Sequence, residues 1–359
     1  MKILDQRTLI ERRFAVQGNL SGSLLGLGKL AGRIADSLTR RRVQQRTEPT
    51  PKALVVSVGN LRVGGTGKTP VVLALAQELA RRGHGGAVLT RGYGAADRGP
   101  RVIDAADETA ADEARVLASG LADGTWTVVQ SRQRVAGLSL LLGQNPRPAV
   151  ILLEDGFQTA KVGRHLDILI LDDWHQQAGK LWPRTGAALP FGPYRETSAG
   201  ASRAQIWLLE DDLSEGDTCS GTGAVVTGFQ RTMSLQPEGE SFAASDQPVF
   251  GLISGLARPQ GFEQGCRRLL TSEPALAIRN RDHCAYDADA VEAMLSEGRS
   301  HGVTDWVTTE KDWVKLSSHW PAGLALATVR LSISWHGKQT LPDLVEERLT
   351  ALGAGPKGI

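Results

Sequence analysis

The strongest constraint on this chain is a glycine-rich turn that follows a short apolar run and precedes a helix-like run. Residues 54–60 read LVVSVGN, as expected of a buried strand, and Pro70 stands where the first turn of a helix tolerates a residue without an N–H. Glycines let the backbone wrap closely round phosphate oxygens, with the positive end of the helix behind them. The turn therefore predicts a site for nucleotide phosphates, and it consists of Val63, Gly64, Gly65, Thr66, Gly67, Lys68 and Thr69.

Two side chains at the end of this turn have the chemistry of a phosphate loop. Lys68 would reach the β- and γ-phosphates of ATP, and the Thr69 hydroxyl would help to hold Mg²⁺. The strict pattern places a further glycine at the position of Arg62, so this loop is a variant. The alternative is an ordinary glycine-rich turn, because the chain contains 41 glycines.

Length and charge narrow the class of protein. At 359 residues the chain exceeds what one hydrophobic core usually organises, so two domains are expected. The formal net charge is only +2 and the basic residues are scattered, which argues against a nucleic-acid partner. Cys219, Cys266 and Cys284 are too few and too dispersed for a disulfide framework, which suits a reducing compartment.

Short β-rich runs alternate with helix-like runs, and this pattern predicts an α/β fold whose mostly parallel sheet is covered on both faces. Together with the phosphate loop, it predicts a P-loop NTPase-like domain followed by a second, smaller α/β domain. The stretch between them is rich in Asp, Glu, Ser, Gly and Thr and is expected to connect them. The predicted regions are an N-terminal helix at 1–45, the P-loop domain at 46–210, the connection at 211–247 and the smaller domain at 248–359.

The N-terminal region has the pattern of a basic amphipathic helix. Leucine and isoleucine recur at three- and four-residue steps, with basic side chains beside them. Such a helix either docks on the protein's own core or lies in an anionic membrane surface, and the residues alone leave both open. No run in the sequence approaches the ~18 apolar residues of a spanning helix. The residues that form the pattern are Leu24, Leu27, Leu30, Ile34 and Leu38, with Lys29, Arg33 and the basic run 40–42.

Acidic residues follow a second apolar run. Glu154 and Asp155 come directly after residues 149–153, at the expected carboxyl end of a strand. Mg²⁺ prefers carboxylate and hydroxyl oxygens, so Asp155 would complete a ligand set begun by Thr69. The sequence therefore predicts a magnesium site beside the phosphate loop.

Two further candidates are less specific when only residue type is considered. Asp112 and Glu113 precede a helix-like run, where acidic residues are common without any function. His283 lies in a loop beside Asp282. A loop histidine is usually just solvated, and it becomes a catalytic candidate only if a carboxylate supports it.

Eight stretches, taken together and in order, resemble the tetraacyldisaccharide 4′-kinases, the lipid A kinases. They include the phosphate loop, both acid pairs and the histidine just described. Eight ordered stretches are far more specific than the phosphate loop alone. They are residues 58–70, 90–94, 112–113, 155–158, 189–196, 255–259, 282–283 and 307–312.

The resemblance implies transfer of a phosphoryl group from ATP, with Mg²⁺, to the 4′-hydroxyl of a tetraacylated glucosamine disaccharide 1-phosphate, which gives lipid IV-A. It also implies a peripheral enzyme at the cytoplasmic face of the bacterial inner membrane, so it favours the membrane-surface alternative for the N-terminal helix. A monomer is expected, without nucleic acid.

The resemblance also assigns roles by position. Asp112 matches the family's catalytic aspartate and His283 its dyad partner, with Lys68 as a third catalytic residue. Glu113 and Asp155 match acids near Mg²⁺. Other active-site positions fall on Arg91, Tyr93, Gln158, Arg195 and Glu196.

Three positions depart from the family's pattern. Glu154 stands where an aspartate is usual, Cys284 where a histidine or an aromatic residue is frequent, and Ala111 where a glycine is expected. None of them carries the chemical step. Two other functions remain open at this point: a P-loop ATPase that acts as a switch or targeting factor without a sugar acceptor, and a kinase for a soluble small molecule.

Overall fold

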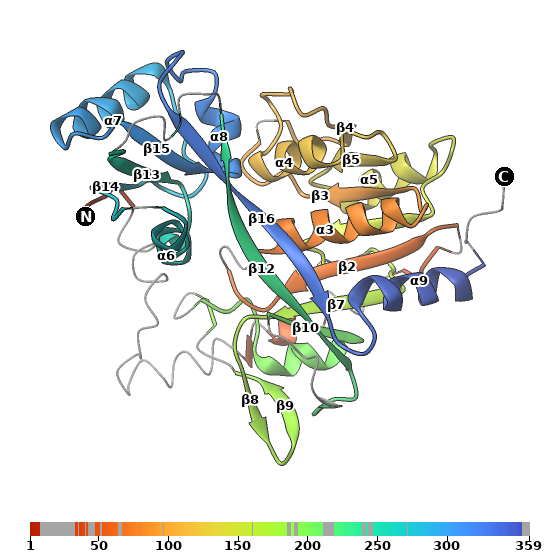
Figure 1. Cartoon of the computed structure of the whole chain (residues 1–359). Helices are drawn as coiled ribbons and strands as arrows, with labels where there is room; N and C mark the ends of the chain where they lie inside the picture. Colours follow the sequence, from red (N-terminus) through yellow and green to blue (C-terminus); the bar gives the residue numbers. More distant parts are fainter. Residues whose placement is uncertain are drawn as a thin grey trace. The chain divides into compact units, whose positions relative to one another are not determined.

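Figure 1 shows the computed structural model of the chain. Part of the predicted phosphate loop, residues 64–66, and residues 24–30 of the predicted N-terminal helix lie outside the residues that it describes. The described residues are 1–7, 33–34, 36–39, 41, 47–50, 52–63, 67–95, 97–159, 161–184, 188–189, 193–210, 219–238, 242, 247–270 and 272–353.

The chain forms two compact units, neither of which is continuous in sequence. Residues 19–231 and 333–359 form the larger unit, and residues 1–18 and 232–332 form the smaller one. The sequence analysis expected contiguous regions, and this division differs from them. Residues 1–18 belong with residues 232–332, and residues 333–359 belong with residues 19–231.

Two long strands run from one unit into the other. They are β12 (Val225–Pro237) and β16 (Leu326–His336), which are neighbours in the sheet. β12 occupies part of the segment 211–247, where the sequence suggested only a connection. Gln230, Arg231 and Thr232 are three polar residues in a row, so the strand lacks a regular alternation of polar and apolar residues, and the polar composition around it obscured it further.

A mostly parallel sheet forms the larger unit, as the sequence predicted (Figure 1). Each neighbouring pair from β12 to β5 is parallel, and β4 is antiparallel at the edge. The carboxyl ends of parallel strands meet at one edge, which is where such sheets bind ligands. The order after β12 is β10 (Ile206–Glu210), β7 (Leu166–Leu171), β2 (Leu54–Asn60), β6 (Val150–Glu154), β3 (Gly86–Thr90), β5 (Trp126–Gln130) and β4 (Arg101–Val102).

Helices cover both faces of this sheet because its central strands are apolar on both sides. On one face Val56 packs in a cluster with Leu75 and Val345, whereas Val55 packs on the other face in a cluster with Leu141. The helices are α3 (Lys68–Arg81), α4 (Asp112–Gly120), α5 (Arg134–Leu142) and α9 (Leu341–Ala351), and the 3₁₀ helix η1 is Ser198–Arg203. A small separate sheet contains β8 (Trp174–Gln177), β9 (Lys180–Pro183) and β11 (Cys219–Ser220).

The smaller unit is a second α/β structure. Neighbouring strands from β1 to β16 are parallel. β1, near the N-terminus, forms the edge of the sheet and pairs with β14, and the sequence predicted neither of these two strands. The strands are β1 (Lys2–Asp5), β14 (Leu276–Arg279), β13 (Phe250–Ser254) and β15 (Asp305–Thr309), followed by β16. The helices are α6 (Pro259–Leu269), α7 (Ala288–Ser300) and α8 (Glu310–Leu316).

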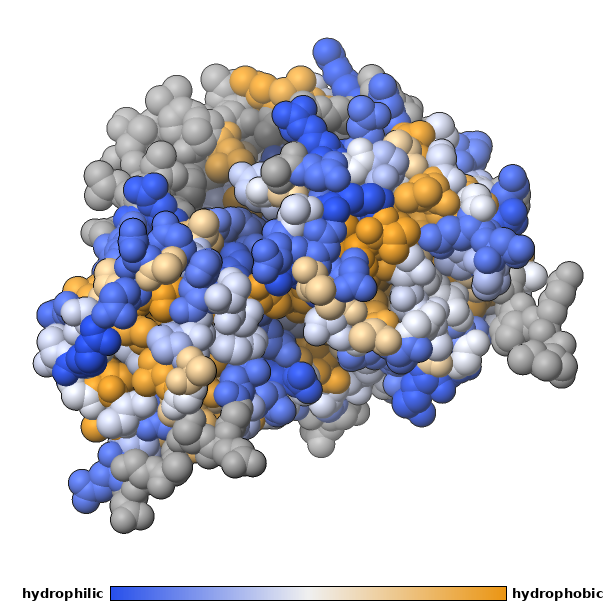
Figure 2. Space-filling model, turned by 90° about the horizontal axis from the view of Figure 1, so that it is seen from above, coloured by the Kyte–Doolittle hydropathy of each residue, from blue (hydrophilic) through white to orange (hydrophobic). Residues whose placement is uncertain are grey.

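Hydrophilic and intermediate residues cover most of the face shown in Figure 2, and apolar residues are exposed between them. Among the helices whose residues the structure describes, none combines the length and the apolar character needed to cross a membrane.

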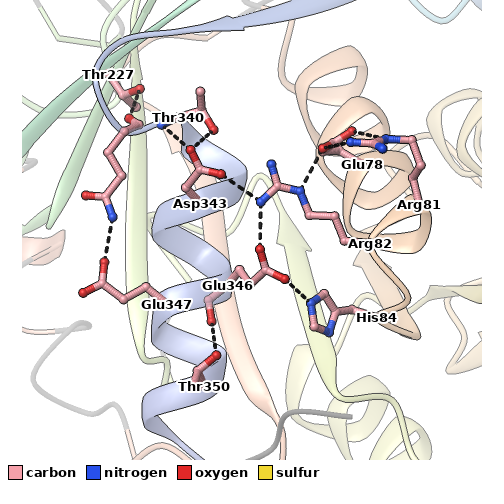
Figure 3. A network of polar contacts seen from close by, with 11 residues as sticks. Glu78, Arg81, Arg82, His84, Thr227, Thr340, Asp343, Glu346, Glu347 and Thr350 are labelled. Carbon is pink, nitrogen blue, oxygen red and sulfur yellow. Dashed lines mark hydrogen bonds and ion pairs between the residues drawn. The ribbon is translucent and has the colours of Figure 1, made fainter. Parts of the chain in front are cut away.

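The last helix, α9, is fixed to the end of α3 by a polar network (Figure 3). Arg82 donates through Nη1 to Asp343 Oδ1 and to Glu346 Oε2, each at 2.8 Å, and through Nε to Glu78 Oε1 at 2.8 Å. Glu346 also lies 2.6 Å from His84 Nε2 through its Oε1 atom. These bonds join the helix that follows the phosphate loop to the far end of the sequence.

This network makes stability depend on pH in the acidic range. Thr340 and Arg82 lower the pKa of Asp343, and His84 and Arg82 lower the pKa of Glu346. Carboxyl pKa values that are lower in the folded state stabilise it at neutral pH, and this stabilisation is lost as the pH falls through those values. We therefore expect Arg82→Met to reduce the free energy of unfolding by about 1 kcal/mol at pH 7, because both acids are partly exposed and water screens them.

The measurement is denaturant unfolding of both proteins between pH 7 and pH 3. The difference between them should shrink as the pH falls below about 4, where the carboxyl groups of the unfolded chain are protonated. The control is Arg299→Met, which removes an exposed ion pair to Glu292 within α7 and should change little at any pH. A difference that is the same at every pH would contradict this account.

Candidate active site

The turn between β2 and α3 ends at a residue that only glycine suits. Gly67 has φ +72°, in the left-handed region, and a Cβ there would lie 2.4 Å from Nη2 of Arg231. Arg231 comes from β12, its pKa is lowered by burial, and its Nη1 lies 3.2 Å from Glu210 Oε2. The sequence did not indicate that a buried guanidinium packs against the phosphate loop.

Glu154 connects the ends of three elements. At the end of β6 its carboxylate accepts a hydrogen bond from Thr69 Oγ1 at 3.0 Å and another from Thr90 Oγ1 at 2.9 Å. Thr69 lies in the first turn of α3, and Thr90 ends β3. Burial raises the pKa of Glu154, and the negative charges of Asp155 and Glu113 raise it further. Three acidic residues therefore lie within electrostatic reach of one another beside the start of α3.

Asp155 is held by two cations. Its Oδ1 atom lies 3.5 Å from Lys68 Nζ and accepts a hydrogen bond of 2.8 Å from Arg195 Nη1. Burial alone would raise the pKa of Asp155, but Lys68 and Arg195 outweigh it and lower the pKa to about 2. Asp155 is therefore ionised at neutral pH. The sequence predicted that Asp155 would lie beside the phosphate loop, and Asp155 contacts Lys68 of that loop.

A third cation, Arg134, interacts with both acids. Arg134, at the start of α5, donates through Nη1 to the carbonyl of Leu89 at 2.5 Å and through Nη2 to the carbonyl of Glu154. Burial lowers the pKa of Arg134 to about 10, against the opposing effect of Glu154 and Asp155. The guanidinium therefore remains charged at neutral pH and compensates the acids from within the protein.

Three of the predicted residues form one hydrogen-bonded chain. Gln158 donates through Nε2 to the carbonyl of Asn60 and to Glu196 Oε1, each at 2.8 Å, and its Oε1 accepts from Arg195 Nη1 at 3.2 Å. Arg203 Nη2 donates to both carboxylate oxygens of Glu196, at 2.9 and 2.8 Å. Gln158, Arg195 and Glu196 are thus brought together, and Arg195 continues the chain to Asp155.

The predicted catalytic aspartate begins a helix. Asp112 and Glu113 occupy the first turn of α4, and the preceding N–H of Ala111 donates to Gln130 Oε1 at 2.8 Å. Gln130 fixes this end of α4, because its Nε2 donates to the carbonyl of Asp97 at 3.0 Å. Of the other predicted positions nearby in sequence, Arg91 is exposed and Tyr93 is 72% exposed.

The predicted histidine belongs to the smaller unit. His283 has φ +59°, and its Nε2 lies 3.7 Å from Asp282 Oδ1 and 3.4 Å from Lys311 Nζ. Lys311 also donates to Asp282 Oδ1 at 2.7 Å. His283 and Asp112 are in different units, so their pairing as a dyad stays a prediction.

The chain matches one known protein family over most of its length. The model of the family Tetraacyldisaccharide-1-P 4′-kinase matches residues 23–350. The chain belongs to this family. The match confirms the resemblance that was drawn from eight short stretches of sequence, and with it the prediction of a kinase.

Relatives in the tetraacyldisaccharide 4′-kinase family match most of the chain. Proteins of that name are 34% identical over 335 residues in Anaeromyxobacter dehalogenans strain 2CP-1, with 86% of this chain and 84% of the relative covered, and 34% identical over 293 residues in Geobacter sulfurreducens, with 74% and 75% covered. The crystal structure of "apo" form LpxK from Aquifex aeolicus in complex with ATP is similar in fold, with a TM-score of 0.64 and 23% identity, and the alignment covers 92% of this chain and 98% of that chain.

Several residues of this site were not predicted from the sequence. Arg134, Arg203 and Arg231 lie outside the eight stretches, within or at the ends of ordinary helices and strands. Thr90 opens one of the stretches, and its place at the end of a strand could have suggested a role beside Glu154.

Gly67→Ala tests the closeness of Arg231 to the loop. Gly124 also has a positive φ, +80°, but no atom lies within 4 Å of a Cβ built there, so Gly124→Ala is a matched control. Both variants should lose about 1 kcal/mol of unfolding free energy through backbone strain. Only Gly67→Ala should raise the dissociation constant of ATP in a titration, because its Cβ displaces Arg231 or the turn. Equal ATP affinities in the two variants would show that this contact is unimportant.

Proposed function

We propose that this chain, a member of the tetraacyldisaccharide 4′-kinase family, transfers the γ-phosphoryl group of ATP to the 4′-hydroxyl of a tetraacylated glucosamine disaccharide 1-phosphate. The product is lipid IV-A. One observation carries the proposal beyond family membership: the ionised carboxylate of Asp155 contacts Lys68 at the start of α3, beside a second acid that binds Thr69. Phosphoryl transfer needs this combination of a mobile cation, a hydroxyl and carboxylates at the phosphate loop.

The triphosphate of ATP is bound by residues 63–69 and the N-terminus of α3. Lys68 is held at 3.5 Å from Asp155, a distance that leaves its ammonium group free to turn toward the β- and γ-phosphates. Asp155 in turn keeps Arg195 beside the site at 2.8 Å. Both cations oppose the negative charge that shifts between oxygens as the phosphoryl group moves.

The residues beside the loop suit a magnesium ion by their donor chemistry, although the described part of the chain contains no group of three His, Cys, Asp or Glu side chains placed to hold a metal. The Thr69 hydroxyl and the carboxylates of Glu113 and Asp155 are the oxygen donors that Mg²⁺ prefers, and Glu154 is placed to orient Thr69. Burial is the main cause of the raised pKa of Glu154, and the repulsion from Asp155 and Glu113 that adds to it is the kind that a divalent cation relieves. When bound, Mg²⁺ would neutralise charge on the β- and γ-phosphates.

Asp112 serves as the general base, with His283 as its partner. A sugar hydroxyl is a poor nucleophile at neutral pH, so a positioned base must accept its proton. Asp112 stands in the first turn of α4, at the positive end of the helix dipole. His283 lies beside Asp282 and Lys311, whose side chains fix the loop that carries it.

Removal of either member of this dyad should lower turnover. We expect Asp112→Asn and His283→Ala each to reduce kcat about 100-fold or more, the effect of losing a general base. The assay follows transfer of radiolabelled phosphate to the lipid acceptor. Asp123→Asn and His319→Ala change exposed residues and should retain activity. Near-normal kcat in either dyad variant would refute its role, and ATP turnover by the unaltered protein without a lipid product would favour a switch ATPase.

The described helical residues near the N-terminus are 33–34, 36–39 and 41, and we call them the N-terminal segment. This segment provides a surface for a lipid acceptor that stays in a membrane. Ile34 is 53% exposed and Leu38 is 49% exposed, and they lie one helical turn apart with the exposed Arg33 and Arg41 beside them. Exposed apolar side chains flanked by basic ones suit an anionic membrane surface. This supports a peripheral location at a membrane surface, and the choice of the cytoplasmic face of the inner membrane follows only from the resemblance to the family.

Vesicle sedimentation tests this surface. The double variant Ile34→Asp, Leu38→Asp should bind vesicles of anionic phospholipid about 10-fold less tightly than the unaltered protein, because two apolar side chains no longer enter the lipid. Val225→Asp alters an apolar residue of β12 that is 46% exposed, and this control should bind normally. If all three proteins bind equally, the segment is not a membrane contact.

A further inference from the structure

Asp36 of the N-terminal segment binds Thr197, a residue that is distant in sequence. Asp36 uses both carboxylate oxygens on one residue: Oδ1 accepts from the backbone N–H of Thr197 at 2.7 Å, and Oδ2 accepts from Thr197 Oγ1 at 2.5 Å. Residues 36 and 197 are 161 positions apart in the sequence. A charged acceptor that satisfies two donors of one residue fixes that residue more firmly than a single neutral bond.

Thr197 directly follows two residues of the predicted active site. Arg195 and Glu196 precede it, and the 3₁₀ helix η1 begins after it, with Thr197 as its N-cap. The other end of η1 also contacts the residue before Thr197. Arg203, at that end, donates to both carboxylate oxygens of the fully buried Glu196. A Cβ at Gly200 would lie 2.4 Å from Glu196 Oε2, so η1 also packs directly on this carboxylate.

The Arg195 backbone is held from the opposite side by the loop after β2. Its N–H donates to the carbonyl of Leu61 at 2.8 Å, and the side chain then reaches Asp155 and Gln158. The segment 195–197 is thus tied at one end to the phosphate-loop strand and at the other end to Asp36. A shift of Thr197 would be transmitted to Arg195 through only one intervening residue.

The N-terminal segment presents different side chains on its two faces. Successive residues of an α-helix are rotated by about 100°, so Asp36 points away from both Ile34 and Leu38. Ile34 and Leu38 are exposed, whereas Thr39 is 7% exposed and Asp36 is partly buried against Thr197. One face of the segment is available to a lipid surface while the other binds the residue next to Glu196.

We propose that Asp36 is a positioning residue, which couples the lipid-facing segment to the active-site arginine through Thr197. Contact of Ile34 and Leu38 with the membrane fixes the segment, Asp36 fixes Thr197, and the chain from Glu196 through Gln158 then holds Arg195 on Asp155. Arg195 is thereby set for phosphoryl transfer when the protein is on the surface that contains its acceptor. The inference rests on the proposed kinase function.

The test is a double-mutant cycle on kinase activity with the lipid acceptor in vesicles. Asp36→Ala should lower kcat about 10-fold, the loss expected when charged hydrogen bonds that position a catalytic group are removed, and should leave the KM for ATP unchanged. In an Arg195→Ala background the same change should have little further effect, because both residues act through one interaction. Asp36→Asn, which keeps one acceptor, should lie between.

Controls separate positioning from folding and from membrane attachment. Asp104→Ala removes an exposed aspartate that accepts a backbone N–H at 2.8 Å elsewhere in the larger unit, and it should not change kcat. Thermal unfolding and vesicle sedimentation are measured for every variant. The proposal is overturned if the effects of Asp36→Ala and Arg195→Ala multiply in full, or if the loss of kcat is explained by weaker vesicle binding or a lower melting temperature. Absence of lipid product with the unaltered protein would instead refute the proposed function.

Discussion

The site depends on the compensation of a buried carboxylate and a partly buried one beside it. Charges are costly to remove from water, so Glu154, which is 6% exposed, and Asp155, whose side chain is 28% exposed, require hydrogen-bond donors and cations close by. Lys68 and Arg195 supply charge to Asp155, Arg134 adds a third positive charge near both acids, and two threonine hydroxyls satisfy Glu154. These partners come from four parts of the chain, so this one requirement draws together the start of α3, the end of β3, α5 and the segment before η1.

Features that are formed by residues adjacent in the chain were predicted from the sequence. An apolar strand, a glycine-rich turn and a helix predict one another because they are adjacent, and β2 and α3 have that form. The alternation of short buried strands with helices likewise predicted a parallel sheet. Partners that are distant in sequence were not predictable. Arg134 and Arg203 belong to no motif, and only the fold places them beside Glu154 and Glu196, where they act as charge partners and hydrogen-bond donors.

The polar strand β12 illustrates the same limit. Its composition resembles a loop, yet it pairs with β10 along Val225–Phe229 and carries Arg231 to Gly67 before the chain enters the smaller unit. His283 lies in that smaller unit, and Asp112 and Lys68 lie in the larger one. Among the described residues, strands β12 and β16 each carry the chain from one unit to the other.

The most direct measurement is a crystal structure with a non-hydrolysable ATP analogue and Mn²⁺ in place of Mg²⁺, with the metal located by its anomalous scattering. We expect Lys68 Nζ to move from Asp155 to the phosphates, and the metal to bind the Thr69 hydroxyl together with the carboxylate of Glu113 or of Asp155. A nucleotide bound elsewhere, or one bound at residues 63–69 with Lys68 still paired to Asp155 and the metal away from these acids, would contradict it.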